Sequence, residues 1–360
     1  MLGGGRVCGS LPATDGGFQC VNLSGGVATP TAERAVDAGG MGEGKRPCWR
    51  RSRPLDPLAR SAGQSQNPGR GQAVLVLRMT GVERLPHVST VVQHVWQAIT
   101  WRIVGYRSMA RALYVMATWD RAQRVPVPIA CDDRVPVVFC TWQRLERISH
   151  ILEMLAEQDV PVQALIWNNS SHRKLVEKAA YDAEIPVQVW HSPRNIGSFG
   201  RFYLVRALAE SGCRRVIIID DDEDFGPDTV RELLAGCPPR SLSAWFAHTI
   251  SGQDFWRRTV PAPGEPVNYV GPGGMAADPA IFADPRLFSC PRRFWFLDDL
   301  WLSWYAVHFA GYTLLRSAAR IEFVEDSLNQ FPRLQWLRQR FWRYLSRQAV
   351  PSRRCQPEWE

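Results

Sequence analysis

A continuous run of β-branched residues at positions 216–219 leads directly into three aspartates, Asp220, Asp221 and Asp222. Such a run is typical of a strand that is buried on both faces of a sheet. Adjacent carboxylates repel one another unless a cation lies among them. Because side chains alternate along a strand, Asp220 and Asp222 point to the same side. The run therefore indicates either a divalent-metal site or a solvated acidic turn.

Strands and helices alternate in the region before this run. Apolar runs and helical spacing predict strands at 135–140, 162–168, 187–191 and 215–219, separated by helices at 144–158, 171–182 and 201–210. This alternation is typical of a parallel sheet with right-handed crossovers. We therefore expect a single α/β, Rossmann-like domain over residues 131–330, with a mostly parallel sheet flanked by helices. In the second half of this domain, the sequence predicts a strand at 244–250, a glycine-rich loop at 271–274 and a helix from about 298 to 309.

The flanks of this domain differ from it in composition. Residues 1–71 are rich in Gly, Pro, Arg and Ser without periodicity, which predicts a disordered segment. Residues 72–130 predict a helical extension that packs on the domain or on a membrane face. Residues 331–360 combine apolar residues and arginines at helical spacing. That pattern fits a helix on an anionic membrane surface, or one that packs on the domain with a solvated basic face.

The composition limits the class of protein. The net charge of +8 favours binding to phosphates or to an anionic membrane surface. Nine scattered cysteines without a disulfide framework favour a reducing compartment. The sequence shows no signal peptide and no apolar stretch of the roughly 20 residues that a spanning helix needs. We therefore expect a cytoplasmic protein that is either free or peripheral at a membrane.

Several motifs of other enzyme classes are absent from the sequence. Without a G-x-x-x-x-G-K-[ST] motif, a P-loop kinase or ATPase is disfavoured. No G-x-G-x-x-G follows the first strand and no G-x-S-x-G occurs, which argues against a dinucleotide dehydrogenase and an α/β-hydrolase. No nucleic-acid-binding module accompanies the basic residues, so we expect no nucleic-acid partner.

Polar residues follow the end of each predicted strand. They are Thr141 and Arg144, then Asn168 and Asn169, then Asn195 and Arg201, and finally the aspartates at 220–222. Open α/β sheets bind ligands in the crevice where the carboxyl ends of their strands meet. There, the donors would hold a nucleoside base and ribose, and the carboxylates would hold a divalent metal against a diphosphate. Each of these residues alone also fits a turn or a solvated side chain.

The order of these elements resembles the nucleotide-sugar glycosyltransferases of the GT-A fold. The resemblance covers residues 134–330 and rests on Phe-Cys-Thr-Trp-Gln-Arg at 139–144, Ile-Trp-Asn-Asn at 166–169, Asn-Ile-Gly at 195–197, Ile-Asp-Asp-Asp at 219–222 and Leu-Asp-Asp-Leu-Trp at 297–301. The chain looks like family 2. Its Trp-Asn-Asn, Asp-Asp-Asp and Asp-Asp elements also resemble the exostosin-type C-terminal transferase domain.

This resemblance implies a metal-dependent enzyme that moves a sugar from a nucleotide-diphosphate donor, with UDP as the expected nucleotide. The acceptor would be a hydroxyl of a glycan, a lipid-linked compound or another molecule. The first strand's end and the asparagines would contact the nucleoside. Asp220 and Asp222, with Asp221 between them, would hold the ribose and Mn²⁺ or Mg²⁺, Asp222 being the expected metal ligand. Asp298 or Asp299 would face the acceptor hydroxyl.

Some alternatives stay open at this point. The late pair is often Glu-Asp in family 2, so the sequence does not assign the acceptor role to one member of the pair. The same aspartates begin a predicted helix, where capping would also explain them. The two resemblances imply opposite anomeric outcomes. A nucleotidyltransferase on a related sheet is a second class, although its glycine-rich basic loop after the first strand is missing here. A degenerate, non-catalytic nucleotide-binding module is a third.

Overall fold

The computed structural model describes residues 21–22, 88–125, 133–326, 328–329 and 331–348. The expectation of disorder for residues 1–71 lies outside these ranges, apart from the two-residue strand β1 (Val21–Asn22). The contacts reported below lie within one compact unit that contains residues 92–360.

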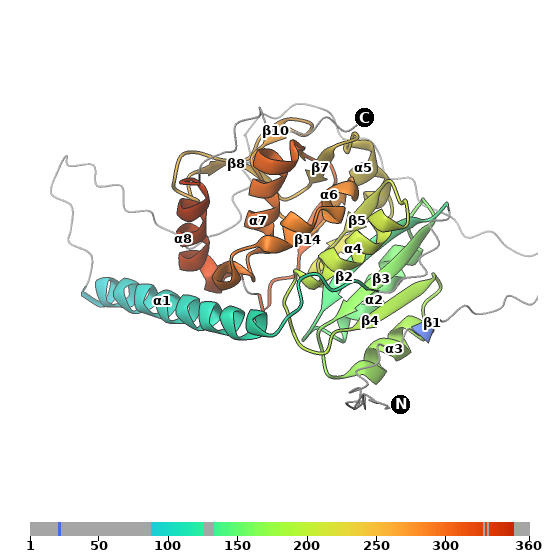
Figure 1. The fold of residues 1–360 in the computed structure, drawn as a ribbon, viewed down its shortest axis with the longest axis horizontal. Helices are drawn as coiled ribbons and strands as arrows, with labels where there is room; N and C mark the ends of the chain where they lie inside the picture. Colours follow the sequence, from blue (N-terminus) through green and yellow to red (C-terminus); the bar gives the residue numbers. More distant parts are fainter. Residues whose placement is uncertain (1–20, 23–87, 126–132, 327, 330, 349–360) are drawn as a thin grey trace, which may run out of the picture. The chain divides into compact units, whose positions relative to one another are not determined.

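The described residues form a main sheet of nine strands (Figure 1). Its first half has four parallel strands in the spatial order β4 (Val187–His191), β3 (Val162–Asn168), β2 (Val135–Thr141) and β5 (Val216–Ile218). The register aligns Thr141 with Asn168, and Asn168 with His191. Three strands therefore end level with one another, at the edge where the polar residues were predicted to meet. The predicted α/β fold, a sheet flanked by helices, is confirmed.

The second half of the sheet is mixed. It continues with β12 (Met275–Ala277), β7 (Ser241–Ala244), β13 (Thr313–Arg316) and β10 (Pro266–Val267), of which only β7 and β13 are parallel neighbours. A smaller sheet contains β11 (Tyr269–Val270), β8 (Ala247–Ile250) and β9 (Arg258–Thr259). A third sheet consists of two antiparallel strands, β6 (Glu223–Phe225) and β14 (Ile321–Phe323). The single strand predicted at 244–250 is thus two strands in different sheets.

Helices cover both faces of the main sheet, because alternate strand residues point to opposite sides. One buried cluster joins Val137 and Phe139 to helices α2 (Arg147–Ala156), α3 (Arg173–Tyr181) and α5 (Thr229–Ala235). The other joins Val138 to α4 (Gly200–Glu210), α6 (Ala280–Ala283), α7 (Asp298–Tyr305) and α8 (Gln335–Leu345). Short helical turns lie at η1 (Pro285–Ser289), η2 (Arg292–Phe294), η3 (Ala306–Ala310) and η4 (Phe331–Leu334).

Helix α4 packs against the sheet, and all its residues from Gly200 to Leu208 are buried. A Cβ at Gly200 would overlap the Trp167 ring of β3. Glycine at this position therefore allows the helix to begin in contact with the strand. The contact between α4 and β3 also places Arg201, the next residue, beside Ile219 and Asp220 at the end of β5.

Two helices that were predicted outside the domain share its core. Helix α1 (Val88–Ala117) contributes Ala112 and Met116 to the second buried cluster, and α8 contributes Leu337 and Phe341. Of the two patterns open for residues 331–360, α8 therefore fits a helix that packs on the domain. None of the helices in the described residues has the length and apolarity needed to cross a bilayer.

Candidate active site

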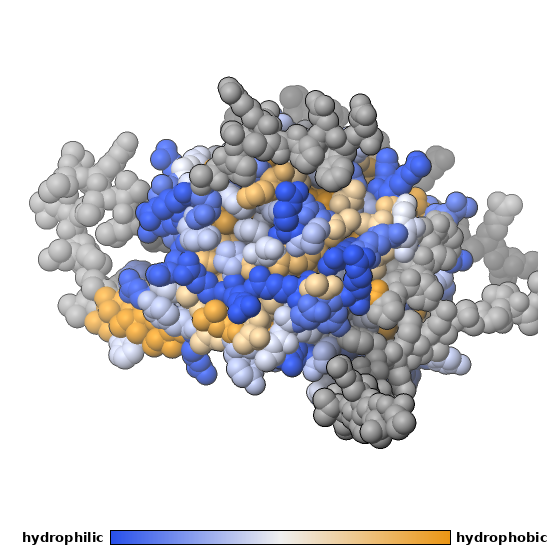
Figure 2. All heavy atoms as spheres, viewed as in Figure 1, coloured by the Kyte–Doolittle hydropathy of each residue, from blue (hydrophilic) through white to orange (hydrophobic). Residues whose placement is uncertain are grey.

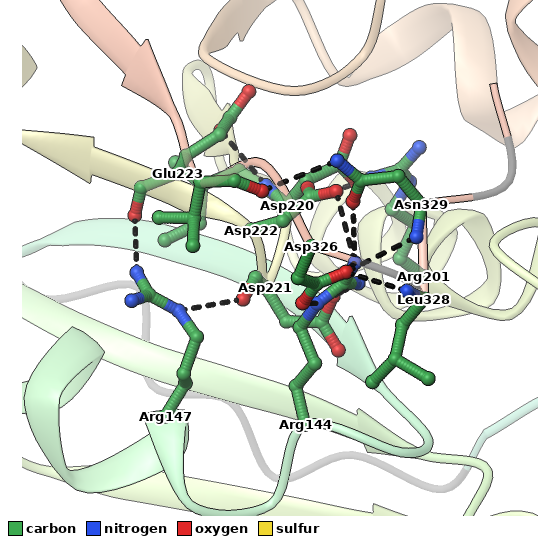
Figure 3. A network of polar contacts seen from close by, with 12 residues as sticks. Arg144, Arg147, Arg201, Asp220, Asp221, Asp222, Glu223, Asp326, Leu328 and Asn329 are labelled. Atoms are coloured by element: carbon green, nitrogen blue, oxygen red, sulfur yellow. Dashed lines mark hydrogen bonds and ion pairs between the residues drawn. The ribbon is translucent and has the colours of Figure 1, made fainter. Parts of the chain in front are cut away.

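The acidic run lies in a turn between β5 and β6, at the carboxyl end of β5 (Figure 3). Ile217 and Ile218 before it are fully buried, as predicted from the apolar run. After the turn, β6 pairs with β14, and the Val324 amide donates a 2.8 Å hydrogen bond to the Asp222 carbonyl. The segment that follows β14 is thereby held beside the aspartates, although about a hundred residues separate the two in the sequence.

Arg144 lies among three carboxylates (Figure 3). Its guanidinium donates two hydrogen bonds of 2.8 Å to the carboxylate of Asp326 and one of 3.1 Å to Asp221. Asp222 Oδ2 is 3.5 Å from the same guanidinium. The hydrogen bond from Arg144 lowers the pKa of Asp326 to about 2. Asp326 was not predicted, because no local pattern connects it to a residue 182 positions away.

Arg201 connects the early aspartates with the late pair. Its guanidinium is ion-paired with the Asp220 carboxylate, and its Nη2 donates to Asp298 Oδ2 at 3.0 Å. Only 2% of Arg201 is exposed, so the two carboxylates share one buried cation. The contact of Arg201 with a nucleotide-sugar donor stays a prediction, because the partners of Arg201 in this structure are carboxylates. By pairing with both carboxylates, Arg201 connects Asp220 in the acidic turn with Asp298 at the start of α7.

Negative charge in the acidic turn is only partly compensated. Burial raises the pKa of Asp221 to about 6, and burial together with the neighbouring Asp220 and Asp221 raises that of Asp222 to about 7. Burial also raises the pKa of Glu223, which is 0% exposed and accepts hydrogen bonds from the Asp220 amide and the Trp245 ring. A positive charge placed beside these carboxylates would favour their ionised forms and oppose the effect of burial.

The chemistry of these side chains fits a hard divalent cation. Carboxylate oxygens are preferred ligands of Mg²⁺ and Mn²⁺, and the Asp220 and Asp222 side chains keep 32% and 20% of their surface exposed. In the part of the chain that the structure describes, no three His, Cys, Asp or Glu side chains are arranged to hold a metal ion. Asp220 and Asp222 instead face Arg201 and Arg144. A cation would therefore compete with these arginines for the carboxylates.

The predicted asparagines and Thr141 brace the loops at the strand ends. Asn168, which is buried, accepts from the Ser170 amide at 2.8 Å and is hydrogen-bonded to His191. Asn169 accepts from Trp167 and Ile196 and donates to Gly197, and Asn195 accepts from the Gly197 amide at 2.8 Å. Thr141 is buried, and its carbonyl accepts from the Asn169 amide. These four residues meet at one edge of the sheet, as predicted, and shape its loops.

The two late aspartates have different partners. Asp298 accepts from Ser198 Oγ at 2.7 Å as well as from Arg201. Asp299 accepts from the Tyr269 hydroxyl at 2.7 Å and is ion-paired with Arg338 of α8. Burial raises the pKa of Asp298. Burial also acts to raise the pKa of Asp299, but the Arg338 charge together with the hydrogen bonds from Tyr269, Arg338 and Leu300 lowers it overall. Asp298 thus faces the acidic turn, and Asp299 faces α8 and β11.

The glycine-rich loop between β11 and β12 lies directly against the acidic turn. A Cβ at Gly273 would overlap Glu223 Oε1 and would be 2.6 Å from Asp220 Oδ2. Gly274 adopts a φ of +56°, where other residues are strained. The glycine-rich loop predicted at 271–274 could in principle have been a plain connector or a backbone that approaches a ligand closely. Its backbone in fact forms one wall of the acidic cluster.

An open groove of about 880 Å³ adjoins this network. Its lining includes Trp142 and Gln143 after β2, Ser170 and His172 after β3, and Leu328 from the segment that binds Arg144. Trp142 is 37% exposed, and Arg111 lies over its ring. The groove runs from the ends of β2 and β3 along α2 and α3, and the predicted asparagines are not part of its lining.

Comparison with known proteins gives structural neighbours only. No protein-family model and no curated protein matches the chain. Among solved structures, the chain is similar to TarS of S. aureus, with a TM-score of 0.37 and 17% identity over 53% of this chain. The match covers 37% of TarS, so the chain spans little more than a third of that protein.

Two further neighbours are enzymes of different kinds. One is the mannosyltransferase PcManGT from Pyrobaculum calidifontis, solved with GDP-Man and Mn²⁺, with a TM-score of 0.43, 17% identity and coverage of 72% of this chain and 76% of that one. The other is the inositol-1-phosphate CTP transferase from T. maritima, with a TM-score of 0.37, 12% identity and coverage of 58% and 97%. Similarity at this level concerns only the arrangement of sheet and helices. The exostosin resemblance stays a prediction.

Proposed function

We propose that this chain is a metal-dependent glycosyltransferase that transfers a sugar from a nucleoside-diphosphate donor, UDP-linked in the first instance, to an acceptor hydroxyl. The observation that carries the proposal is the shared contact of Arg201 with Asp220 and Asp298. That contact joins a turn suited to a metal-bound diphosphate with a carboxylate suited to an acceptor proton. Glycosyl transfer uses both functions, since the leaving diphosphate needs charge stabilisation and the acceptor hydroxyl must lose a proton.

Asp220 and Asp222 are the residues that would hold Mn²⁺ or Mg²⁺. A cation there would neutralise the charge that develops on the leaving diphosphate. Arg144 and Arg201 lie against the same carboxylates and would supply positive charge beside the phosphates. The groove at Trp142 would take the nucleoside, beside the loops that follow β2 and β3.

Asp298 is the member of the late pair that we assign to the acceptor. It shares Arg201 with the acidic turn, and burial raises its pKa, which favours acceptance of a proton. Asp299 is held by Tyr269 and by Arg338, and those contacts leave it a positioning role at the start of α7. The acceptor hydroxyl would lose its proton to Asp298 as its oxygen attacks the anomeric carbon and the nucleoside diphosphate leaves.

The test is nucleotide release from a panel of UDP- and GDP-sugars, with Mn²⁺ or with a chelator. Asp222→Asn should lose transfer, and Asp298→Asn should lower the rate by about 10²–10⁴-fold, the usual contribution of a general base. Asp224→Asn is the matched control, because Asp224 follows the same turn but is paired with Arg147. Full activity in chelator, or an Asp222→Asn enzyme as active as the control, would reject the mechanism.

The same assay separates the other classes. A nucleotidyltransferase would release pyrophosphate from a nucleoside triphosphate and would not release nucleotide from sugar donors. A non-catalytic module would bind a nucleoside diphosphate without turnover of any donor. We also propose that the chain associates with a membrane surface through exposed residues of α1.

A further inference from the structure

Helix α1 has apolar residues on two opposite faces. The inner face packs on the domain through Ala112, Val115 and Met116, which are at most 7% exposed. Gly105 lies on the same face, where a Cβ would be 2.5 Å from the Trp336 ring of α8. This face explains how α1 is held, and it needs no further partner.

The opposite face of α1 carries apolar side chains that the domain does not cover. We call it the outer stripe and define it by Val92, Val95, Trp96, Ile99, Ile103 and Tyr106, which recur at helical spacing and are between 39% and 64% exposed. Figure 2 shows hydrophobic residues gathered on the described part of α1, at the lower left, with paler and hydrophilic residues beside them. Single exposed apolar residues are ordinary, but a continuous stripe of this length marks an interaction surface.

The charge of α1 is entirely of one sign. Residues 88–117 contain no Asp or Glu, whereas Arg102, Arg107 and Arg111 are present. Arg102 and Arg107 are exposed beside the outer stripe. Arg111 instead lies over the rings of Trp142 and Phe296, at 5.0 and 5.7 Å, and so ties the helix to the loop after β2. The outer stripe is therefore an apolar surface flanked by cations.

We propose that the outer stripe docks this protein onto an anionic lipid bilayer, with α1 lying in the plane of the interface. The apolar side chains would enter the boundary between headgroups and acyl chains, with Trp96 and Tyr106 at the depth that aromatic residues favour. Arg102 and Arg107 would extend along that boundary and meet lipid phosphates. Since α1 does not qualify as a spanning helix, it lies on the bilayer and does not cross it.

Charge also decides against a second copy of this chain as the occupant. A two-fold contact would bring the outer stripe against itself. Arg102 and Arg107 would then face the same arginines of the partner, and α1 offers no carboxylate to compensate them. An anionic surface satisfies both the apolar residues and the arginines. This inference rests on α1 alone and does not depend on the proposed sugar transfer.

The test is flotation of the full chain with vesicles made of equal parts phosphatidylcholine and phosphatidylserine, and with vesicles of phosphatidylcholine alone. The chain should bind the anionic vesicles and leave the neutral ones largely unbound. Trp96→Ser/Ile103→Ser should weaken binding more than about tenfold, because two exposed apolar side chains no longer enter the bilayer. Tyr181→Ser/Val260→Ser, which alters an exposed aromatic and an exposed aliphatic residue elsewhere, should bind like the wild type.

A second variant isolates the electrostatic contribution. Arg102→Glu/Arg107→Glu should bind neither type of vesicle, and both exposed-residue variants should keep the wild-type thermal unfolding midpoint. The proposal is overturned if the wild type fails to bind anionic vesicles, or if Trp96→Ser/Ile103→Ser binds as well as the control. It is likewise overturned if the wild type is a dimer in solution that Trp96→Ser/Ile103→Ser converts to a monomer.

Discussion

At the scale of single residues, His248 shows how a buried histidine is kept neutral. It lies on β8, is 7% exposed and packs beside Phe246, with ring centroids 4.6 Å apart. Burial, and then the charges of Arg258 and Arg316, lower its pKa from 6.5 to about 3. Below pH 6.5, His248 binds a proton in the unfolded chain, whereas in the folded chain it stays neutral until the pH approaches 3. Stability is therefore lost as the pH falls from 6.5 towards 3.

A substitution at this position tests that sign. His248→Phe cannot be protonated, so its stability relative to the wild type should increase as the pH falls below 6.5. At about pH 4 we expect a gain of about 1–3 kcal/mol over the difference measured at neutral pH. Urea denaturation of both proteins across the pH range measures it. A difference that stays constant with pH would show that His248 is protonated in the folded state.

At the scale of elements, the loop between β11 and β12 restricts the acidic turn. Gly273 leaves no room for a side chain against Glu223 and Asp220, so the loop fixes how far these carboxylates can separate. Because Glu223 is buried and accepts hydrogen bonds from the Asp220 amide and the Trp245 ring, its carboxylate cannot move aside without loss of those contacts. The geometry of the proposed metal site therefore depends on a backbone that contributes no side chain.

Gly273→Ala should lower the affinity for Mn²⁺ more than about tenfold, because a one-ångström displacement of a ligand is costly at a site of this kind. Calorimetric titration with manganese measures the change. Gly226→Ala, near the end of β6, is the control, since a Cβ there would meet only Asp228 Oδ1 at 3.3 Å. Equal manganese affinity in the two variants would mean that Asp220 is not a ligand, or that the loop backbone shifts to make room for the added methyl group.

The elements also show what the sequence could and could not predict. The strand ends were predictable, because apolar runs and alternating helices define a parallel sheet and place its polar ends together. Asp326, Tyr269 and Arg338 were not, since each reaches the site through contacts between residues far apart in the chain. The strand predicted at 244–250 failed for a similar reason. Its apolar pattern is continuous, but the partners β12 and β11 belong to different sheets.

At the scale of the whole molecule, the site is completed by the last described helix. Arg338 of α8 is ion-paired with Asp299 of α7, and both are buried. Loss of one member would remove the nearest opposite charge of the other in a buried pair, and breaking such a pair costs about 3–5 kcal/mol. The packing of α8 and the chemistry of the late pair are therefore energetically connected.

A double-mutant cycle measures this connection. Arg338→Met and Asp299→Asn should each destabilise the chain by about 3–5 kcal/mol, and the double variant should lose clearly less than the sum. Arg343→Met, on the exposed side of the same helix, should change the free energy of unfolding by less than about 0.5 kcal/mol. Additive losses in urea denaturation would show that the two side chains do not interact.

The pairing of Asp299 with a residue 39 positions downstream also affects how the chain is made. During translation, the core strands leave the ribosome well before Arg338 does. Until then, a nascent chain that closed over Asp299 would bury an unmatched carboxylate, so premature closure is disfavoured. We therefore expect the final packing of α7 to follow the synthesis of α8.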